Sequence, residues 1–344
     1  MKSYNEALKI LKKSHIKISH EIVKSVDSLN RICSSNIYSK NNYPAENNTS
    51  LDGFAINFNN TKGISNKKFK IVGSISAGSK PYRKILKKNE AVEIMTGGVM
   101  PKGSNSIIPI EECTFTKDEN NRYIIIKRYY QKFENVRLKG SDYKIRDLVI
   151  KKNTLINSSH IKALKALGIE KIEVKRKINI VFFSSGNEIS EKNQIDTWKI
   201  RNSNHHYLKS LNINFLFNFK NLGILRDNDE NRFYKKLSKI LKSKTDIVIT
   251  SGAVSAGKFD FIPKAIYKFK LSHSFKNILI RPGKPILFAK FKNKSKVIFG
   301  LPGNPISTAA CFRFFIFPYI RNILGLNTEA PIKARLKNTF SKKK

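Results

Sequence analysis

The 344-residue sequence predicts a multidomain α/β protein, in which a small β-rich domain precedes a three-layer α/β domain with a mostly parallel sheet. Three observations lead to this prediction. The chain is long enough for two or three domains of typical size. Between residues 50 and 126, short β-type runs are separated by glycines. After residue 176, apolar runs alternate with amphipathic helical patterns.

The first half of the chain contains two helical patterns that flank the β-rich region. Ser3 and Glu6 form a capping box, which predicts a helix whose buried face comprises Ala7, Leu8 and Leu11. Residues 70–75 and 123–126 are expected strands of the β-rich domain. A second helix is expected over residues 157–168, because apolar residues at helical spacing are followed there by a glycine, which commonly ends a helix.

The second half alternates strands and helices, which is typical of a parallel sheet with helices on both faces. Strands are expected at 178–183, 213–219 and 246–250. Asn202 or Ser203 is expected to cap a helix that ends near Leu211. Asp227 and Glu230 predict the start of another helix, with an apolar face of Phe233, Leu237, Ile240 and Leu241.

The last predicted elements are a hairpin and a long helix. Residues 286–290 and 297–299 are expected to pair around a turn at 292–294. Asn304 is expected to cap a helix that has Pro305 at its first position and ends near Leu324.

The charge is strongly basic, with 66 Lys and Arg against 25 Asp and Glu and a net charge of +41. Such an excess suits a nucleic-acid binder, because cations neutralise phosphates. However, the cations are spread along the whole chain, together with abundant Asn and Ile. This composition is typical of an AT-rich genome, so we interpret the charge as compositional bias and expect no nucleic-acid partner.

The cysteine count and the hydropathy pattern indicate a cytoplasmic protein without a membrane segment. The three cysteines lie far apart, which excludes a disulfide framework and a cysteine zinc site. The most apolar run, 312–320, contains Arg313 and Pro318 and is shorter than the roughly 20 residues that span a bilayer. The N-terminus has no secretory signal pattern.

Three loops rich in Gly, Ser and Pro follow expected strands, at 184–188, 250–257 and 300–305. Small residues let a ligand approach the backbone, and exposed N–H groups attract anions. Tight turns use the same residues, but three such loops at one sheet edge predict a site for an elongated, phosphorylated ligand. The candidate binding residues are Ser184, Gly186, Ser251, Gly252, Ser255, Gly257, Pro302, Gly303 and Asn304.

Charged side chains accompany these loops. Arg281 and Lys284 are flanked by prolines, which suits the binding of an oxyanion better than two solvated surface cations would. Carboxylates beside a phosphate site often hold Mg²⁺. The scarce candidates are Asp52, Asp142, Glu188, Asp227 and Asp260, although helix capping also explains Asp227 and a turn also explains Asp260. The sequence shows neither a histidine zinc pattern nor a hydrolase triad.

In their order along the chain, these motifs resemble the MoeA family of molybdopterin molybdenumtransferases, which is related to the gephyrin E domain. The resemblance begins with SLDGFA at 50–55, IMTGG at 94–98 followed by Pro101 and Gly103, and ENVR at 134–137 followed by GSD at 140–142. It continues with the three loops and with RPGKP at 281–285. The similarity covers almost the whole chain.

The resemblance implies Mg²⁺-dependent insertion of molybdate into adenylylated molybdopterin, with release of AMP. It also implies a homodimer, and molybdopterin adenylyltransferase as a functional partner. The positions that match catalytic residues are Asp52, Thr96, Asp142, Glu188, Asp227 and Asp260. Asp142 and Glu188 match candidate Mg²⁺ ligands, whereas Arg281 and Lys284 match the molybdate site. The sequence leaves tungstate open as an alternative to molybdate.

The resemblance also implies a domain plan. Residues 1–48 and 135–175 match an elongated linker and dimerisation domain, 49–134 the inserted β-rich domain, and 176–326 the molybdopterin-binding α/β domain. Residues 327–344 match a remnant or the start of a C-terminal β-rich domain, which the chain is expected to lack. A non-catalytic pterin carrier or scaffold is therefore the alternative function. The departures from the family pattern are Asn202, Ala253, Lys258 and Lys276.

Overall fold

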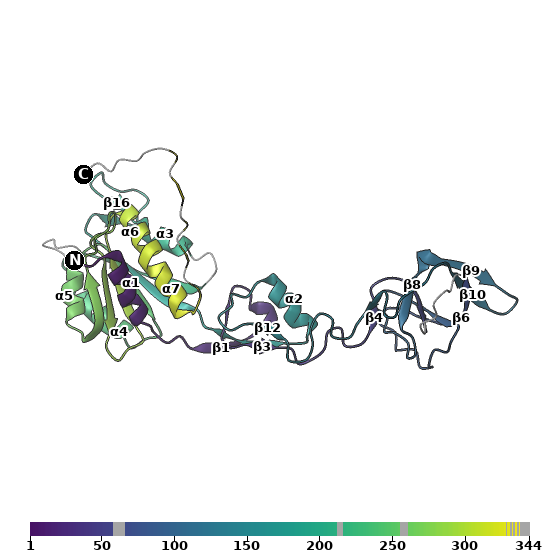
Figure 1. Cartoon of the computed structure of the whole chain (residues 1–344). Coiled ribbons are helices and arrows are strands. Elements are labelled where there is room, and N and C mark those ends of the chain that lie inside the picture. The colour runs from purple at the N-terminus through teal and green to yellow at the C-terminus, as the bar shows by residue number, and fades with distance from the viewer. Residues whose placement is uncertain are drawn as a thin grey trace. The chain divides into compact units, whose positions relative to one another are not determined.

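The computed structural model describes residues 1–57, 66–211, 216–254, 261–327, 329–330, 332, 334–335 and 337. The chain folds into two compact units (Figure 1). Unit 1 comprises Met1–Ser35, Lys151–Ile161 and Lys171–Lys344, and unit 2 comprises Asn36–Ile150 and Lys162–Glu170.

Unit 2 is built on a six-stranded, mostly antiparallel sheet in the order β8-β5-β7-β6-β10-β9. Its strands are β5 (Gly53–Ile56), β6 (Lys67–Ile75), β7 (Glu90–Ile94), β8 (Ser106–Pro109), β9 (Cys113–Lys117) and β10 (Arg122–Ile126). Both strands that the sequence predicts here, at 70–75 and 123–126, are confirmed within β6 and β10. Two short pairs complete the unit, β4 (Asn48–Thr49) with β11 (Val136–Arg137) and β3 (Ile37–Tyr38) with β12 (Leu148–Ile150).

Unit 1 contains a six-stranded sheet in the order β17-β14-β18-β21-β20-β19. The strands β17 (Phe217–Leu225), β14 (Ile178–Ser185), β18 (Ile247–Ser251) and β21 (Val297–Leu301) are parallel, whereas β20 (Leu287–Phe291) and β19 (Leu271–Lys276) are antiparallel. The predicted mostly parallel sheet and its final hairpin are thus confirmed. Unit 1 also contains a small sheet of β1 (His20–Lys24), β13 (Lys171–Lys175) and β2 (Ile32–Cys33).

Helices cover both faces of the six-stranded sheet of unit 1 (Figure 1). Alternate residues of β14 point into two separate hydrophobic clusters: Phe182 packs into one and Phe183 into the other. The first cluster includes residues of α1 (Tyr4–Lys13), α3 (Asn204–Ser210), α6 (Pro305–Cys311) and α7 (Phe317–Ile323). The second includes residues of α4 (Glu230–Ile240) and α5 (Phe261–Tyr267).

Several helix boundaries follow the sequence prediction. The capping box of Ser3 and Glu6 starts α1, and Asn304 accepts a hydrogen bond from the Ser307 N–H at the start of α6. A π-helical turn at Phe312–Ile316 joins α6 to α7, so the long final helix is not regular. Helix α2 (Ser158–Ala166) is followed by Gly168 at φ +69°, a conformation that favours glycine.

Three local predictions need correction. Neither Asn202 nor Ser203 caps α3 with its side chain, because the Asn202 amide is used elsewhere. The helix at 230 has Asp229, not Asp227, at its N-cap position. The strand expected at 213–219 begins later, at Phe217, and runs to Leu225; the expected start, at 213–215, lies outside the described residues.

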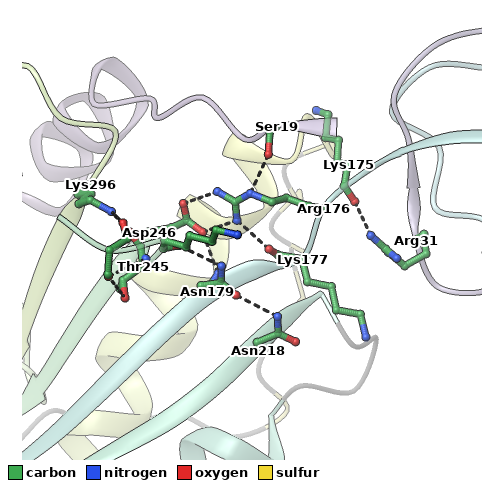
Figure 2. A network of polar contacts seen from close by, with 12 residues as sticks. Ser19, Arg31, Lys175, Arg176, Lys177, Asn179, Asn218, Thr245, Asp246 and Lys296 are labelled. Carbon is green, nitrogen blue, oxygen red and sulfur yellow. Dashed lines mark hydrogen bonds and ion pairs between the residues drawn. The ribbon is translucent and has the colours of Figure 1, made fainter. Parts of the chain in front are cut away.

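A bidentate ion pair lies near the amino ends of the parallel strands (Figure 2). Arg176 donates from Nη1 and Nη2 to the two carboxylate oxygens of Asp246, both at 2.7 Å. The Asn179 N–H also donates to Asp246, at 2.8 Å, and Arg176 Nε donates to Ser19 Oγ at 2.9 Å. The Asp246 side chain is only 5% exposed, and its hydrogen bonds raise the pKa of Arg176. This network joins the chain that enters from β13 to strands β14 and β18.

No helix in the described part of the chain is long and apolar enough to cross a membrane. The apolar run that begins at Phe312 instead packs against the sheet of unit 1, where Phe312, Phe315 and Ile316 belong to the first cluster.

Replacing Tyr319 by Phe is expected to destabilise unit 1 by about 1–2 kcal/mol, because it leaves a buried carbonyl unpaired. Tyr319 is 1% exposed, and its hydroxyl donates to the Ser14 carbonyl at 2.9 Å. Urea unfolding measures the difference. Tyr267→Phe is the control, since Tyr267 is 53% exposed and should change stability by less than about 0.5 kcal/mol. Equal changes in the free energy of unfolding in the two variants would show that the Tyr319 hydrogen bond does not stabilise unit 1.

Candidate active site

The three predicted loops lie at one edge of the unit 1 sheet, because β14, β18 and β21 are adjacent and parallel. Their backbones approach closely: the Gly252 N–H donates to the Leu301 carbonyl at 2.9 Å. A Cβ atom on Gly252, which has φ +95°, would lie 2.3 Å from the Ser185 carbonyl oxygen. A Cβ on Gly303 would lie 3.6 Å from the Gly252 Cα. The glycines therefore let the backbones of the three loops approach one another closely, and Gly303 is exposed at this edge.

Two asparagines at the start of α3 connect these loops. Asn204 Nδ2 donates to Ser251 Oγ at 2.7 Å and to the Gly303 carbonyl at 2.9 Å. Ser184 Oγ donates to Asn202 Oδ1 at 2.8 Å. The sequence analysis treats Asn202 as a helix cap and as a departure from the family pattern, and it gives Asn204 no role. It could not find these contacts, because they join residues up to 99 positions apart.

Two cations fix the first loop, and sequence reasoning missed both. Arg226 Nη1 donates to the Gly186 carbonyl at 2.9 Å, to the Asn187 carbonyl at 3.3 Å and to the Ile189 carbonyl at 2.9 Å. Lys199 Nζ donates to the Asn187 carbonyl at 2.7 Å. Both cations therefore hold the loop through its backbone carbonyls. The one sequence signal that could have identified Arg226 is its position directly before the candidate residue Asp227.

Glu188 and Asp227 place two carboxylates beside this loop. Asn187 Nδ2 donates to Asp227 Oδ2 at 2.9 Å, and the Asp227 N–H donates back to Asn187 Oδ1 at 3.3 Å. Asp227 is therefore oriented by the loop and does not cap a helix. A Cβ on Gly186 would lie 2.3 Å from Glu188 Oε2, so the Glu188 carboxylate rests on the glycine backbone. Neither carboxylate forms an ion pair among the described residues.

Arg281 and Lys284 are exposed on a loop that packs against α6. The Ile278 N–H donates to the Lys284 carbonyl at 2.9 Å, and a Cβ on the buried Gly283 would lie 2.9 Å from Cys311 Sγ. Within the described residues, neither cation has an acidic partner. Both charges are therefore available to an anion, and the loop that carries them is held in place.

The second loop is described only up to Val254. Ser255, Gly257, Lys258 and Asp260 lie outside the described residues. Ala253, which stands where the resembled motif has glycine, adopts φ +52°. An alanine pays about 1–2 kcal/mol for this left-handed conformation, so the loop keeps the glycine-like backbone at a cost in stability.

Unit 2 holds the other candidate residues in two pairs. Asp52 Oδ1 accepts from both the N–H and Oγ1 of Thr96, each at 2.7 Å, and these hydrogen bonds lower the pKa of Asp52. Asp142 Oδ2 accepts from Arg137 Nη2 at 2.6 Å. The structure thus brings Asp52 and Thr96 together, whereas it pairs Asp142 with a cation that the sequence analysis had given no role.

A parallel sheet carries three glycine loops, two oriented carboxylates, and two cations that have no acidic partner in the described part of the chain. This is the arrangement by which α/β proteins bind phosphorylated ligands at the carboxyl edge of the sheet. Two family models match the chain: "MoeA N-terminal region (domain I and II)" over residues 2–168 and "Probable molybdopterin binding domain" over residues 182–322. The chain belongs to the MoeA family of molybdopterin molybdenumtransferases.

Individual relatives agree with this assignment. A molybdopterin molybdenumtransferase of Staphylococcus epidermidis is 30% identical over 99% of this chain and 80% of its own length. One from Staphylococcus aureus is 31% identical over 92% of this chain and 74% of its own. A MoeA protein structure from Pyrococcus horikoshii matches with a TM-score of 0.80 and 27% identity, covering 94% of this chain and 80% of that one. The resemblance and the fold class predicted from the sequence are thereby confirmed.

Proposed function

We propose that this molybdopterin molybdenumtransferase homologue inserts molybdate into adenylylated molybdopterin and releases AMP in a Mg²⁺-dependent step. One observation carries the proposal: three glycine-containing loops meet at one edge of the unit 1 sheet. The same unit presents Arg281 and Lys284, which have no acidic partner among the described residues. The loops suit a substrate with a phosphate and an adenylate, because backbone N–H groups bind phosphate oxygens. The cations suit the molybdate dianion.

The chain contributes to this reaction mainly by positioning. Arg281 and Lys284 hold the oxyanion on a fixed loop, while Arg226 and Asn204 keep the phosphate-binding loops in shape. Because the protein holds both reactants side by side, the reaction between them needs no further encounter in solution. Preorganised charges also stabilise the charge that develops as the AMP leaves. The proposal requires no side-chain nucleophile.

Glu188 and Asp227 fit a Mg²⁺ site, since neither carboxylate forms an ion pair with any residue that the structure describes. Among the described residues, no group of three or more His, Cys, Asp or Glu side chains is arranged to hold a metal. This agrees with Mg²⁺, which takes one or two carboxylates and completes its shell with phosphates and water. When bound, the ion would neutralise charge on the substrate phosphates. Asp142 lies in unit 2, where it is paired with Arg137, and only the family resemblance makes it a candidate Mg²⁺ ligand.

We further propose a homodimer in the cytoplasm that receives its substrate from molybdopterin adenylyltransferase. Unit 1 exposes Ile22, Val26 and Leu29, at 72%, 51% and 47%, along one short segment. Exposed apolar residues grouped in this way suit an interface between copies. Three free cysteines suit a reducing compartment.

Purified protein, mixed with adenylylated molybdopterin and Mg²⁺, is expected to release AMP only when molybdate is added. Chromatographic quantification of AMP measures this, with controls lacking molybdate or containing EDTA. Release that depends on both additions supports the transferase. Tight pterin binding without release in any mixture would contradict it and favour a pterin carrier.

A further inference from the structure

A polar hollow lies beside the first glycine loop, at residues 184–188. It has a volume of about 560 Å³, and its walls come from residues 190–193, residues 201–203, His205, His206 and Asn221. Asn202 forms part of the wall and also accepts the hydrogen bond from Ser184 Oγ at 2.8 Å. The hollow is therefore connected to the candidate active site through a single side chain.

Glu191 is an unusual acid in this wall. Its Oε1 accepts from Asn202 Nδ2 at 3.2 Å and from Asn221 Nδ2 at 3.1 Å. In a chain with a net charge of +41, Glu191 forms no ion pair among the described residues. Two neutral amides thus orient the carboxylate through one oxygen. The other oxygen keeps its capacity to accept hydrogen bonds from a ligand.

His205 supplies a second polar group of the wall. Its Nδ1 atom is buried and forms no side-chain hydrogen bond in the described structure. Burial and the neighbouring His206 lower the pKa of His205, so its ring is neutral at pH 7 and offers one donor and one acceptor. The wall therefore combines an anionic acceptor and a neutral imidazole with two cationic side chains, Lys192 and Arg201. No group suited to a metal ion is found here among the described residues.

We propose that this hollow holds the pterin ring, with Glu191 accepting hydrogen bonds from the 2-amino and N3–H groups of its 2-amino-4-oxopyrimidine edge. This proposal rests on the function proposed above, since it assigns one part of the same substrate. The free oxygen of the Glu191 carboxylate can accept from these two adjacent N–H groups, and hydrogen bonds to an ionised acceptor are stronger than neutral ones. Guanine carries the same hydrogen-bonding edge, so a guanine nucleotide is the other ligand that could present these two N–H groups to Glu191.

The test is a titration followed by pterin fluorescence, with 6-hydroxymethylpterin and its lumazine analogue, in which oxygen replaces the 2-amino group. The wild-type protein is expected to bind the pterin at least tenfold more tightly than the lumazine. Glu191→Gln is expected to lose at least tenfold in pterin affinity and most of this preference. Glu170→Gln, which changes a carboxylate with a 69% exposed side chain outside the hollow, is the matched control and should behave as the wild type.

Equal wild-type affinity for pterin and lumazine, or an unchanged pterin affinity in Glu191→Gln, would overturn the proposal. Thermal unfolding checks that Glu191→Gln is folded, and Glu191→Asp, which keeps the charge, should recover part of the preference. GMP is titrated in parallel: tighter binding of GMP than of the pterin would assign the hollow to a guanine nucleotide and overturn the pterin assignment.

The AMP-release assay separates this proposal from the proposed function. Glu191-dependent pterin binding without AMP release would leave the subsite standing and reject the transferase. AMP release with the same KM in the wild type and Glu191→Gln would reject the subsite and leave the transferase standing.

Discussion

Asp246→Ala is expected to destabilise unit 1 by about 3–5 kcal/mol, because it leaves the partly buried guanidinium of Arg176 without its partner. The Asp246 side chain is 5% exposed and accepts two 2.7 Å hydrogen bonds from Arg176 (Figure 2). It also accepts from the Asn179 N–H, which the substitution would leave unpaired. Urea unfolding, followed by circular dichroism, measures the loss.

Two comparisons make this prediction specific. Glu329→Ala removes an ion pair with Arg313, in which the two side chains are 43% and 56% exposed, and should cost less than about 1 kcal/mol. Replacing both partners by apolar residues, as in Arg176→Met with Asp246→Leu, should recover much of the lost stability, because no buried charge remains unpaired. A loss below about 1 kcal/mol in Asp246→Ala would mean that the network contributes little.

Lys284→Ala is expected to lower molybdate-dependent AMP release by about 100-fold or more, the usual effect of removing one preorganised charge. The side chain is exposed and has no acidic partner among the described residues, so the unfolding midpoint should not change. Initial rates at saturating substrate, with molybdate varied, measure the loss. Lys264→Ala, which removes an exposed cation of α5, is the control.

The carboxylates extend this test to the proposed metal site. Glu188→Gln and Asp142→Asn are expected to keep the fold and lose activity, since each substitution removes a negative charge and keeps the side-chain size. Retained AMP release in Lys284→Ala, Glu188→Gln and Asp142→Asn together would reject the assigned site. Loss only in Lys284→Ala would restrict the site to its anion-binding part.

The sequence by itself determined the local elements and the family. The capping box of α1, the Asn304–Pro305 start of α6 and the apolar run of β14 follow from side chains within a few positions of one another. The three loops could be placed at one sheet edge because parallel strands with crossover helices leave their carboxyl ends on the same side. The ordered motifs then indicated the MoeA family, which the comparisons confirm.

Only the tertiary structure decided which groups hold the site in shape. Asp227 was ambiguous in the sequence because a cap and a loop contact need the same residue type, and the path of the chain places it on Asn187. Arg226, Asn204 and Arg176 donate to partners between 37 and 157 positions away. The local propensities of the residues contain no information about contacts between segments so far apart in the sequence. These hydrogen bonds exist because the packed sheet brings remote segments within 3 Å, and only the folded chain shows which segments meet.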